Sequence, residues 1–380
     1  MKPQSVTISK IFKNYDLCEY CAGRLISKFT GKPSSKLLGK KYLKKFSKSP
    51  DTKCYICKNI FQNFDIMLSN IYEKSNNIDF KTFNLGLTLK NSFLEKDDYI
   101  KSKFKIKGIE NIKFGISKEM AKKISQKTKS KRILVDPEMF IQANFKDESC
   151  TIRTKPIFIY GRYNKKIRKL PQKQLSCKKC NGIGCHNCDF KGFENIESIE
   201  GKLSNFLIKK FDGTQVKINW IGGEDQSSLV LGKGRPFFVK ILNPKRRNRT
   251  LRKSLKLEDI SLLDLKKISA QPKGSIPFKS KVSIIVDTKK PISLIQLKKL
   301  QNLENSKIHD PSKDKKGNSR QIYEIHYKKL GKNSFLLDLF ADGGISLKSF
   351  IQNSDVTPNV SELLENSCKC KSLDFKNIII

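Results

Sequence analysis

Apolar and polar residues alternate in short runs along this chain and predict many small elements separated by polar turns. In the first half, residues 80–89, 132–137 and 140–145 have the alternation of half-buried strands. Residues 118–128 space their apolar side chains along one face of a basic helix, and residues 36–48 predict a second basic helix. Strands and helices mixed in this way predict an α+β fold.

The second half of the chain reads mostly as strands. From residue 196 onward the apolar runs are short, and helices are expected only over residues such as 262–268 and 294–303. Residues 305–319 are rich in Lys, Asp, Ser and Gly and predict a surface loop. We find neither an internal repeat nor a low-complexity tail.

The net charge of the chain indicates which class of partner it binds. Lys and Arg number 77 against 36 for Asp and Glu, a formal net charge of +41, and the basic residues are spread along the whole sequence. Part of this lysine excess matches what AT-rich coding composition produces. The size of this positive charge still favours a polyanion as the partner, and a nucleic acid over an acidic protein. Such binding weakens as the salt concentration rises.

The hydropathy of the sequence does not predict a membrane protein. No apolar run approaches the roughly 20 residues that cross a bilayer. The residues after Met1 lack the apolar stretch of a secretory signal. We therefore expect a cytoplasmic protein that needs neither a membrane nor an obligate protein partner.

Eight of the eleven cysteines form four Cys-x2-Cys pairs. Such pairs in an intracellular chain predict zinc, because a tetrahedral ion takes two thiolates from each of two pairs. A redox role is disfavoured, because we expect neither set of cysteine pairs to lie at the start of a helix in a thioredoxin-like setting. We expect two structural zinc ions, because four thiolates leave no open position for water. The ligands would be Cys18, Cys21, Cys54 and Cys57 for one ion and Cys177, Cys180, Cys185 and Cys188 for the other.

The three other cysteines lie outside these pairs. We expect Cys150 to be a half-buried strand residue, and Cys368 and Cys370 to take no part in metal binding.

One carboxylate, Asp225, lies in a glycine-flanked turn just before the basic run 231–237. A turn alone explains Asp beside Gly, because both residues favour turns. None of the three histidines is placed for a relay, and no phosphate-binding loop or deaminase signature is present. Direct attack of the carboxylate on a nucleotide remains a consistent hypothesis, because it needs only a flipped base and a neighbouring cation.

Several motifs, in order, resemble the archaeal tRNA pseudouridine synthases that modify the two adjacent T-arm uridines, conventionally numbered 54 and 55. The resemblance covers most of the chain. It rests on the Leu-Cys-Glu-Tyr-Cys-Ala-Gly-Arg-Leu run at 17–25, Tyr-Gly-Arg-Tyr at 160–163, the catalytic segment 222–237, Asn-Pro-Lys-Arg at 243–246, Asp-Gly-Gly-Ile-Ser-Leu-Lys at 342–348, and the segments 357–364 and 373–374.

The resemblance implies a catalytic residue, Asp225, that breaks the C1′–N1 bond of the uridine while Lys348 keeps it charged. Leu347 and Leu373 would form apolar walls for the base, and Arg235, Gly343 and Gly344 would contact the substrate. It also implies a zinc-containing THUMP-like RNA-binding domain, which grips the acceptor end of tRNA, followed by a mixed-sheet pseudouridine synthase domain. The expected segments are 1–60 (zinc), 61–155 (THUMP-like), 156–195 (basic connector with the second cysteine cluster) and 196–380 (catalytic).

The chain departs from the family pattern around the nucleophile. Gly223 replaces an Arg, Ser227 an Asp and Leu229 an Arg, while Val282 or a neighbour stands where a stacking Tyr is expected. We expect a working enzyme, slower or restricted in position. A non-catalytic tRNA-binding protein is the alternative. A THUMP-type methyltransferase or thiolation enzyme is disfavoured, because no loop for S-adenosylmethionine or ATP is visible.

Overall fold

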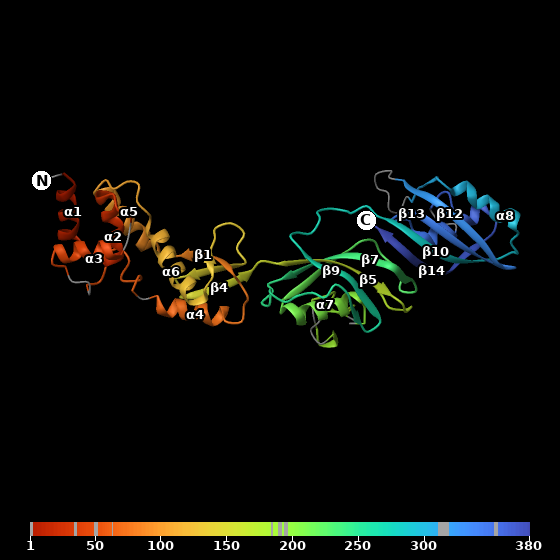
Figure 1. The fold of residues 1–380 in the computed structure, drawn as a ribbon, viewed down its shortest axis with the longest axis horizontal. Helices are drawn as coiled ribbons and strands as arrows, with labels where there is room; N and C mark the ends of the chain where they lie inside the picture. Colours follow the sequence, from red (N-terminus) through yellow and green to blue (C-terminus); the bar gives the residue numbers. More distant parts are fainter. Residues whose placement is uncertain are drawn as a thin grey trace. The chain divides into compact units, whose positions relative to one another are not determined.

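A computed structural model describes residues 3–33, 36–48, 52–62, 64–183, 185–188, 192–193, 197–310, 319–352 and 356–380. The chain divides into two compact units, Met1–Lys155 with Lys245–Arg247, and Pro156–Pro244 with Asn248–Ile380 (Figure 1). Each unit has its own hydrophobic core. Residues 311–318 of the predicted surface loop lie outside the described residues.

The first unit joins helices to a four-stranded sheet of order β2-β1-β3-β4. Strand β1 runs parallel to β2 and β3, and β3 pairs antiparallel with β4. Its helices are α1 (Pro3–Asn14), α2 (Glu19–Thr30), α3 (Lys36–Lys45), α4 (Asp65–Ser75), α5 (Asn91–Lys103) and α6 (Ile112–Thr128). Its strands are β1 (Thr82–Thr88), β2 (Lys131–Arg132), β3 (Met139–Asn144) and β4 (Ser149–Thr154).

Most predicted elements of the first unit are confirmed, and one is wrong. The strands expected at 80–89 and 140–145 are β1 and β3, and α6 begins where Asn111 caps the Phe114 N–H at 2.7 Å. The strand expected over 132–137 ends after Arg132, at the end of β2. Asp136 has φ +53° and Pro137 has no N–H to donate, so this segment turns instead of pairing.

The second unit is built on a ten-stranded mixed sheet of order β11-β12-β13-β10-β14-β7-β5-β9-β8, with β6 beside β7. Among the described strands, β14 and β7 pair in parallel through Asp374–Leu229 and Phe375–Val230, and the other neighbours are antiparallel. The strands are β5 (Ile157–Lys165), β6 (Gln215–Trp220), β7 (Leu229–Leu242), β8 (Leu255–Leu257), β9 (Ile260–Ile268), β10 (Lys279–Thr288), β11 (Lys307–Ile308), β12 (Arg320–Gly331), β13 (Ser334–Asp342) and β14 (Cys368–Ile379).

Short helices accompany this sheet. In Figure 1, α7 (Ile199–Phe211) lies beside the β5–β7–β9 part, and α8 (Leu294–Lys298) lies at the far end near β12 and β13. The others are the 3-10 turns η1 (His186–Cys188) and η2 (Lys299–Leu303) and the helices α9 (Leu347–Gln352) and α10 (Val360–Leu363). No helix in the described part of the chain combines the length and apolar character that crossing a membrane requires.

The helix predicted over 262–268 is wrong, because these residues form β9. Leu262 and Leu265 are both buried and three residues apart, which imitates one helical turn. The cause is a register shift opposite Tyr160 and Arg162, where Asp264 adopts φ +51°. An extra residue in one strand moves the next inward side chain along by one position. The helix predicted over 294–303 is confirmed as two short pieces, α8 and η2.

Residues 157–165, expected to lie in a connector that begins at 156, are a strand in the interior of the sheet. Strand β5 pairs with β7 on one side and β9 on the other. Its inward side chains include Ile157, Ile159 and Tyr163, all buried in the core of the second unit. The boundary between the units accordingly falls at Lys155–Pro156.

Candidate active site

A cavity of about 280 Å³ lies beside the parallel junction of β7 and β14 in the second unit. This is close to the lower end of the roughly 300–1,000 Å³ of small-molecule sites, enough for one base-sized group. Its lining includes six of the residues predicted for the site: Asp225, Arg235, Gly344, Leu347, Lys348 and Leu373. Gly343 lies next to it, under the ring of Phe278.

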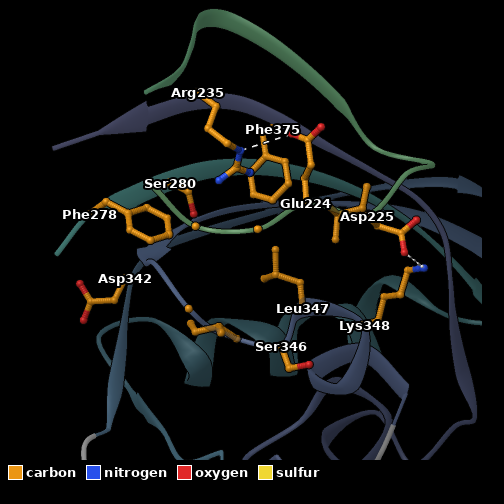
Figure 2. A pocket seen from close by; sticks show the side chains of 15 residues that line it. Glu224, Asp225, Arg235, Phe278, Ser280, Asp342, Ser346, Leu347, Lys348 and Phe375 are labelled. Carbon is orange, nitrogen blue, oxygen red and sulfur yellow. Dashed lines mark hydrogen bonds and ion pairs between the residues drawn. The ribbon is translucent and has the colours of Figure 1, made fainter. Parts of the chain in front are cut away.

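Asp225 and Lys348 meet at one side of this cavity (Figure 2). Lys348 Nζ lies 2.8 Å from Asp225 Oδ2. The other carboxylate oxygen accepts the Ser227 N–H at 2.9 Å and the Ser227 hydroxyl. These contacts, with Lys348 the largest, lower the pKa of Asp225 to about 2. Asp225 is therefore ionised at neutral pH, and 38% of its side chain remains exposed.

Ser227 occupies the position where the resemblance expects a second carboxylate. Its hydroxyl and its N–H both donate to Asp225. A neutral donor stabilises the charged form of Asp225, whereas a carboxylate there would disfavour it. This departure from the family pattern therefore keeps the carboxylate of Asp225 ionised.

The turn that carries Asp225 depends on a glycine. Gly222 has φ +73°, and an added Cβ would lie 2.5 Å from the ring of Phe278. Gly223, where the resemblance expects Arg, has only Gln172 Oε1 near an added Cβ, at 4.0 Å. The Ser228 N–H closes the turn on the Asp225 carbonyl at 2.9 Å.

Glu224, beside the predicted nucleophile, is the centre of a buried ionic group. Its carboxylate lies 3.0 Å from Lys165 Nζ and 3.3 Å from Arg235 Nε, and all three side chains have no exposed surface. Arg235 also donates to the Ile221 carbonyl at 2.8 Å, and its guanidinium lies over Phe375. Our reading of the sequence missed Glu224 and Lys165. Strand alternation could have identified Lys165 as a buried residue, because it continues the inward-facing positions of β5.

Phe278 supplies an aromatic wall that the sequence reading did not identify. It lines the cavity on the side away from Lys348 (Figure 2). The Gly343 N–H donates to its carbonyl at 2.7 Å. Val282, the residue suggested by the spacing, is buried in the core and is not among the residues that line the cavity. On β10, the residue that faces the cavity is Ser280.

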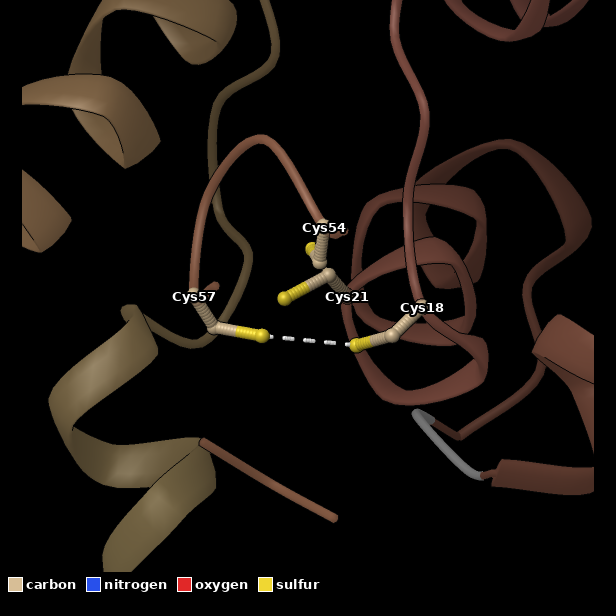
Figure 3. Close-up of side chains that lie close together, drawn as sticks. All are labelled: Cys18, Cys21, Cys54 and Cys57. Carbon is tan, nitrogen blue, oxygen red and sulfur yellow. Dashed lines mark hydrogen bonds between the residues drawn. The ribbon is translucent and has the colours of Figure 1, made fainter. Parts of the chain in front are cut away.

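The predicted cysteine clusters both converge. In the first unit, the sulfurs of Cys18, Cys21, Cys54 and Cys57 lie within 4.8 Å of one another and point to a common centre (Figure 3). The Cys18 and Cys57 Sγ atoms are 3.5 Å apart. Four thiolates on tetrahedral zinc, with Zn–S bonds of about 2.3 Å, require sulfur separations of about 3.8 Å. This donor set therefore fits such an ion.

The second cluster has similar spacing in the second unit. The Sγ atoms of Cys177 and Cys185 are 3.9 Å apart, and those of Cys180 and Cys188 are 3.8 Å apart. The Cys185 and Gly192 N–H groups donate to Cys188 Sγ at 3.2 Å. With the Cys185 bond the larger cause, they lower the pKa of Cys188 to about 7. Lowering that pKa favours the thiolate, the form that binds a metal ion.

The remaining cysteines stay outside both groups. Cys150 lies on β4 and is more deeply buried than expected, with 2% of its surface exposed. Cys368 and Cys370 lie on β14 and belong to neither four-cysteine group among the described residues.

Two family models match the chain, one over part of the first unit and one over most of the second. Residues 158–378 match the model described as Pus10, C-terminal, and residues 68–144 match the Pus10 THUMP domain, archaeal. The first match spans more than half of the chain.

Curated proteins with the name Pus10 align with nearly the full length of the chain. The chain is 44% identical to the tRNA pseudouridine synthase Pus10 of Nitrosopumilus maritimus, over 97% of this chain and 96% of that protein. It is 29% identical to the protein of the same name from Cenarchaeum symbiosum, over 97% and 91%. Among solved structures, an H/ACA RNP bound to a substrate RNA matches with a TM-score of 0.30 and 9% identity over 57% of this chain and 47% of that one, a likeness too weak to support an argument.

Proposed function

The chain belongs to the Pus10 family of tRNA pseudouridine synthases, and we propose that it isomerises uridine to pseudouridine in the T-arm of tRNA, at position 54, position 55 or both, with Asp225 as the nucleophile. One observation carries this proposal. Asp225 is ionised, half-exposed and paired with Lys348 at the edge of a cavity of base size.

The reaction needs no net addition or loss of atoms. The Asp225 carboxylate attacks the nucleotide, the C1′–N1 bond breaks, and its electron pair stays on the uracil. The uracil then rotates within the cavity, C5 bonds to C1′, and the carboxylate is released. The proton lost from C5 is balanced by the proton gained at N1.

The other cavity residues have roles that follow from their chemistry. Lys348 keeps Asp225 ionised, because its ammonium stabilises the charged form. Leu347 and Leu373 offer apolar surface to the released base, and Gly344 leaves room beside them. Arg235 acts on the substrate only through Glu224 and the turn, since its side chain has no exposed surface.

The partner is tRNA, bound through both units. The THUMP match and the net charge of +41 support binding of its acceptor end and T-arm. Each four-cysteine cluster would hold one structural Zn²⁺, which takes no part in the reaction. The ion of the first cluster would join two segments that are distant in the sequence, and the ion of the second would close the short segment 177–188. We assign the activity to the cytoplasm and to the chain alone.

Gly223 favours a second candidate, a non-catalytic tRNA-binding protein. Arg is expected there, and in its place the turn has open space. The test is to map pseudouridine in a T-arm transcript after incubation with the wild type and with Asp225→Asn, a variant of the same shape. Product with the wild type alone supports the enzyme. Product with both overturns the nucleophile assignment, and tight binding without product establishes the non-catalytic protein.

A further inference from the structure

Lys165 is a lysine with no exposed surface at the end of β5. Its ammonium contacts three consecutive residues of the turn that carries Asp225. Nζ lies 3.0 Å from the Glu224 carboxylate, 3.5 Å from the Asp225 carbonyl oxygen and 3.4 Å from the Gln226 carbonyl oxygen. A fourth acceptor, the Leu170 carbonyl, lies at 3.0 Å.

A buried ammonium is costly unless its donors are satisfied and its charge is paired. Here both conditions are met by Glu224 and by backbone carbonyls, and three of the four acceptors belong to the turn. The ammonium is therefore stable only while residues 224–226 keep this conformation. The converse also holds, since the turn loses these contacts when Lys165 is removed.

Two more residues from the segment that follows β5 hold the same turn. Arg168 Nη1 donates to the Ser227 carbonyl at 2.6 Å, and Gln172 Nε2 donates to the Gly222 carbonyl at 3.3 Å. Arg168 also forms a two-point pair with Asp374, at 2.7 and 2.9 Å. The segment 165–172 thus contacts four carbonyls of the turn, with Lys165 at its most buried point.

We propose that Lys165 is a positioning residue for the nucleophile: it fixes the backbone at 224–226, so that the Asp225 carboxylate points at Lys348 and the cavity. The inference rests on the proposed role of Asp225. Lys165 acts through the backbone, because the carboxylate of Asp225 has Lys348 and Ser227 as its partners. Lys165 does not line the cavity and therefore does not touch the substrate.

The test is Lys165→Met in the full chain, which keeps the length of the side chain and removes the ammonium. We expect the single-turnover rate on a tRNA transcript to fall about 100-fold, as a misplacement of about 1 Å can cause. The Kd for tRNA should stay within about threefold of the wild type, because uniform binding is unchanged. A rate loss matched by an equal loss of binding would overturn the proposal.

The matched control is Leu300→Ala in η2. Leu300 is fully buried in the same unit and does not line the cavity. This variant should lower Tm by creating a core cavity, yet keep the rate within about threefold of the wild type. If Lys165→Met loses no more activity than this control, Lys165 is only a stabilising residue. Should Lys165→Met fail to fold, Lys165→Gln replaces it, and a wild-type rate for Lys165→Gln overturns the proposal.

A second measurement does not depend on activity. Hydrogen exchange of the Ser227 and Ser228 amides, which close the turn, should accelerate about tenfold in Lys165→Met and stay unchanged in Leu300→Ala. Unchanged exchange in Lys165→Met contradicts the inference. If the wild type forms no pseudouridine, the proposed function fails, while the exchange rates still report whether Lys165 holds the turn.

Discussion

Asp225 and Lys348 lie 123 residues apart in the chain and form an ion pair of 2.8 Å at the cavity. Asp225 comes from the turn before β7, and Lys348 comes from the first turn of α9. Both side chains are partly exposed, so water screens the pair and its contribution to stability is small. Its main effect is on the charge state and direction of the carboxylate.

Lys348→Met should shift the pH dependence of the reaction. Lys348, with a smaller effect of Ser227, lowers the pKa of Asp225 to about 2, so the carboxylate is ionised above that pH. Without the ammonium the pKa rises toward the ordinary value of 3.8, and the acid limb of the pH–rate profile moves to higher pH by about one unit. Single-turnover rates from about pH 2 to about pH 8 measure the shift, since the wild-type limb lies near the Asp225 pKa of about 2. Lys348→Arg keeps the charge and should keep the acid limb, and an unmoved limb in Lys348→Met would contradict this account.

Gly222→Ala should damage the turn, while Gly223→Ala should not. At position 222 the backbone has φ +73° and an added methyl group meets the Phe278 ring, so we expect a loss of about 1–3 kcal/mol in the free energy of unfolding. Position 223 has neither restriction, and its variant should stay within about 0.5 kcal/mol of the wild type. Thermal unfolding and the rate of product formation measure both. Equal effects at the two positions would mean that the conformation of the turn does not matter.

Motifs with short spacing were predictable from the sequence, because their geometry is local. Only residues 181–184 separate the two pairs of the second cluster, so a short loop suffices to bring its four sulfurs together. The first cluster also converges, although residues 22–53 separate its pairs, because each Cys-x2-Cys pair by itself offers two thiolates to one ion. The tight turn at Asp225 was predictable for the same reason. The roles of the cavity residues came from the family resemblance, since no local rule connects Asp225 with Lys348.

The features that escaped the sequence reading depend on contacts between distant segments. Lys165 meets the turn 60 residues later, so strand alternation can place its side chain inward, but its contact with the turn appears only when β5 and β7 pair. At Asp264 a bulge imitated the spacing of a helix. We placed the position of the family's stacking Tyr near Val282, where this chain has none, and did not identify Phe278, which lines the cavity just before β10 begins.

Removal of metal should unfold the parts that the cysteine clusters hold. We expect about two zinc ions per chain by elemental analysis, one for each set of four thiolates. Cys57→Ser should lose about one ion and destabilise the first unit, because an incomplete donor set binds zinc weakly. Cys150→Ala is the matched control, since Cys150 is buried in the same unit but belongs to neither group. A content below one ion in the wild type would refute both sites.

Phe278→Ala should slow the reaction more than it weakens the fold. The ring lines the cavity and packs on Gly222 and Gly343, so its removal takes away one of the two phenylalanine rings, Phe278 and Phe375, that a base in the cavity could stack on. Stacking of a base on an aromatic side chain is worth about 1–3 kcal/mol, which corresponds to a loss of roughly 5–150-fold in kcat/KM. Phe278→Tyr keeps the ring and should retain most of the activity.

Val282→Ala, in the core, should lower Tm with little change in kcat/KM. If Val282→Ala proves the more damaging of the two for catalysis, the aromatic wall has been assigned to the wrong residue.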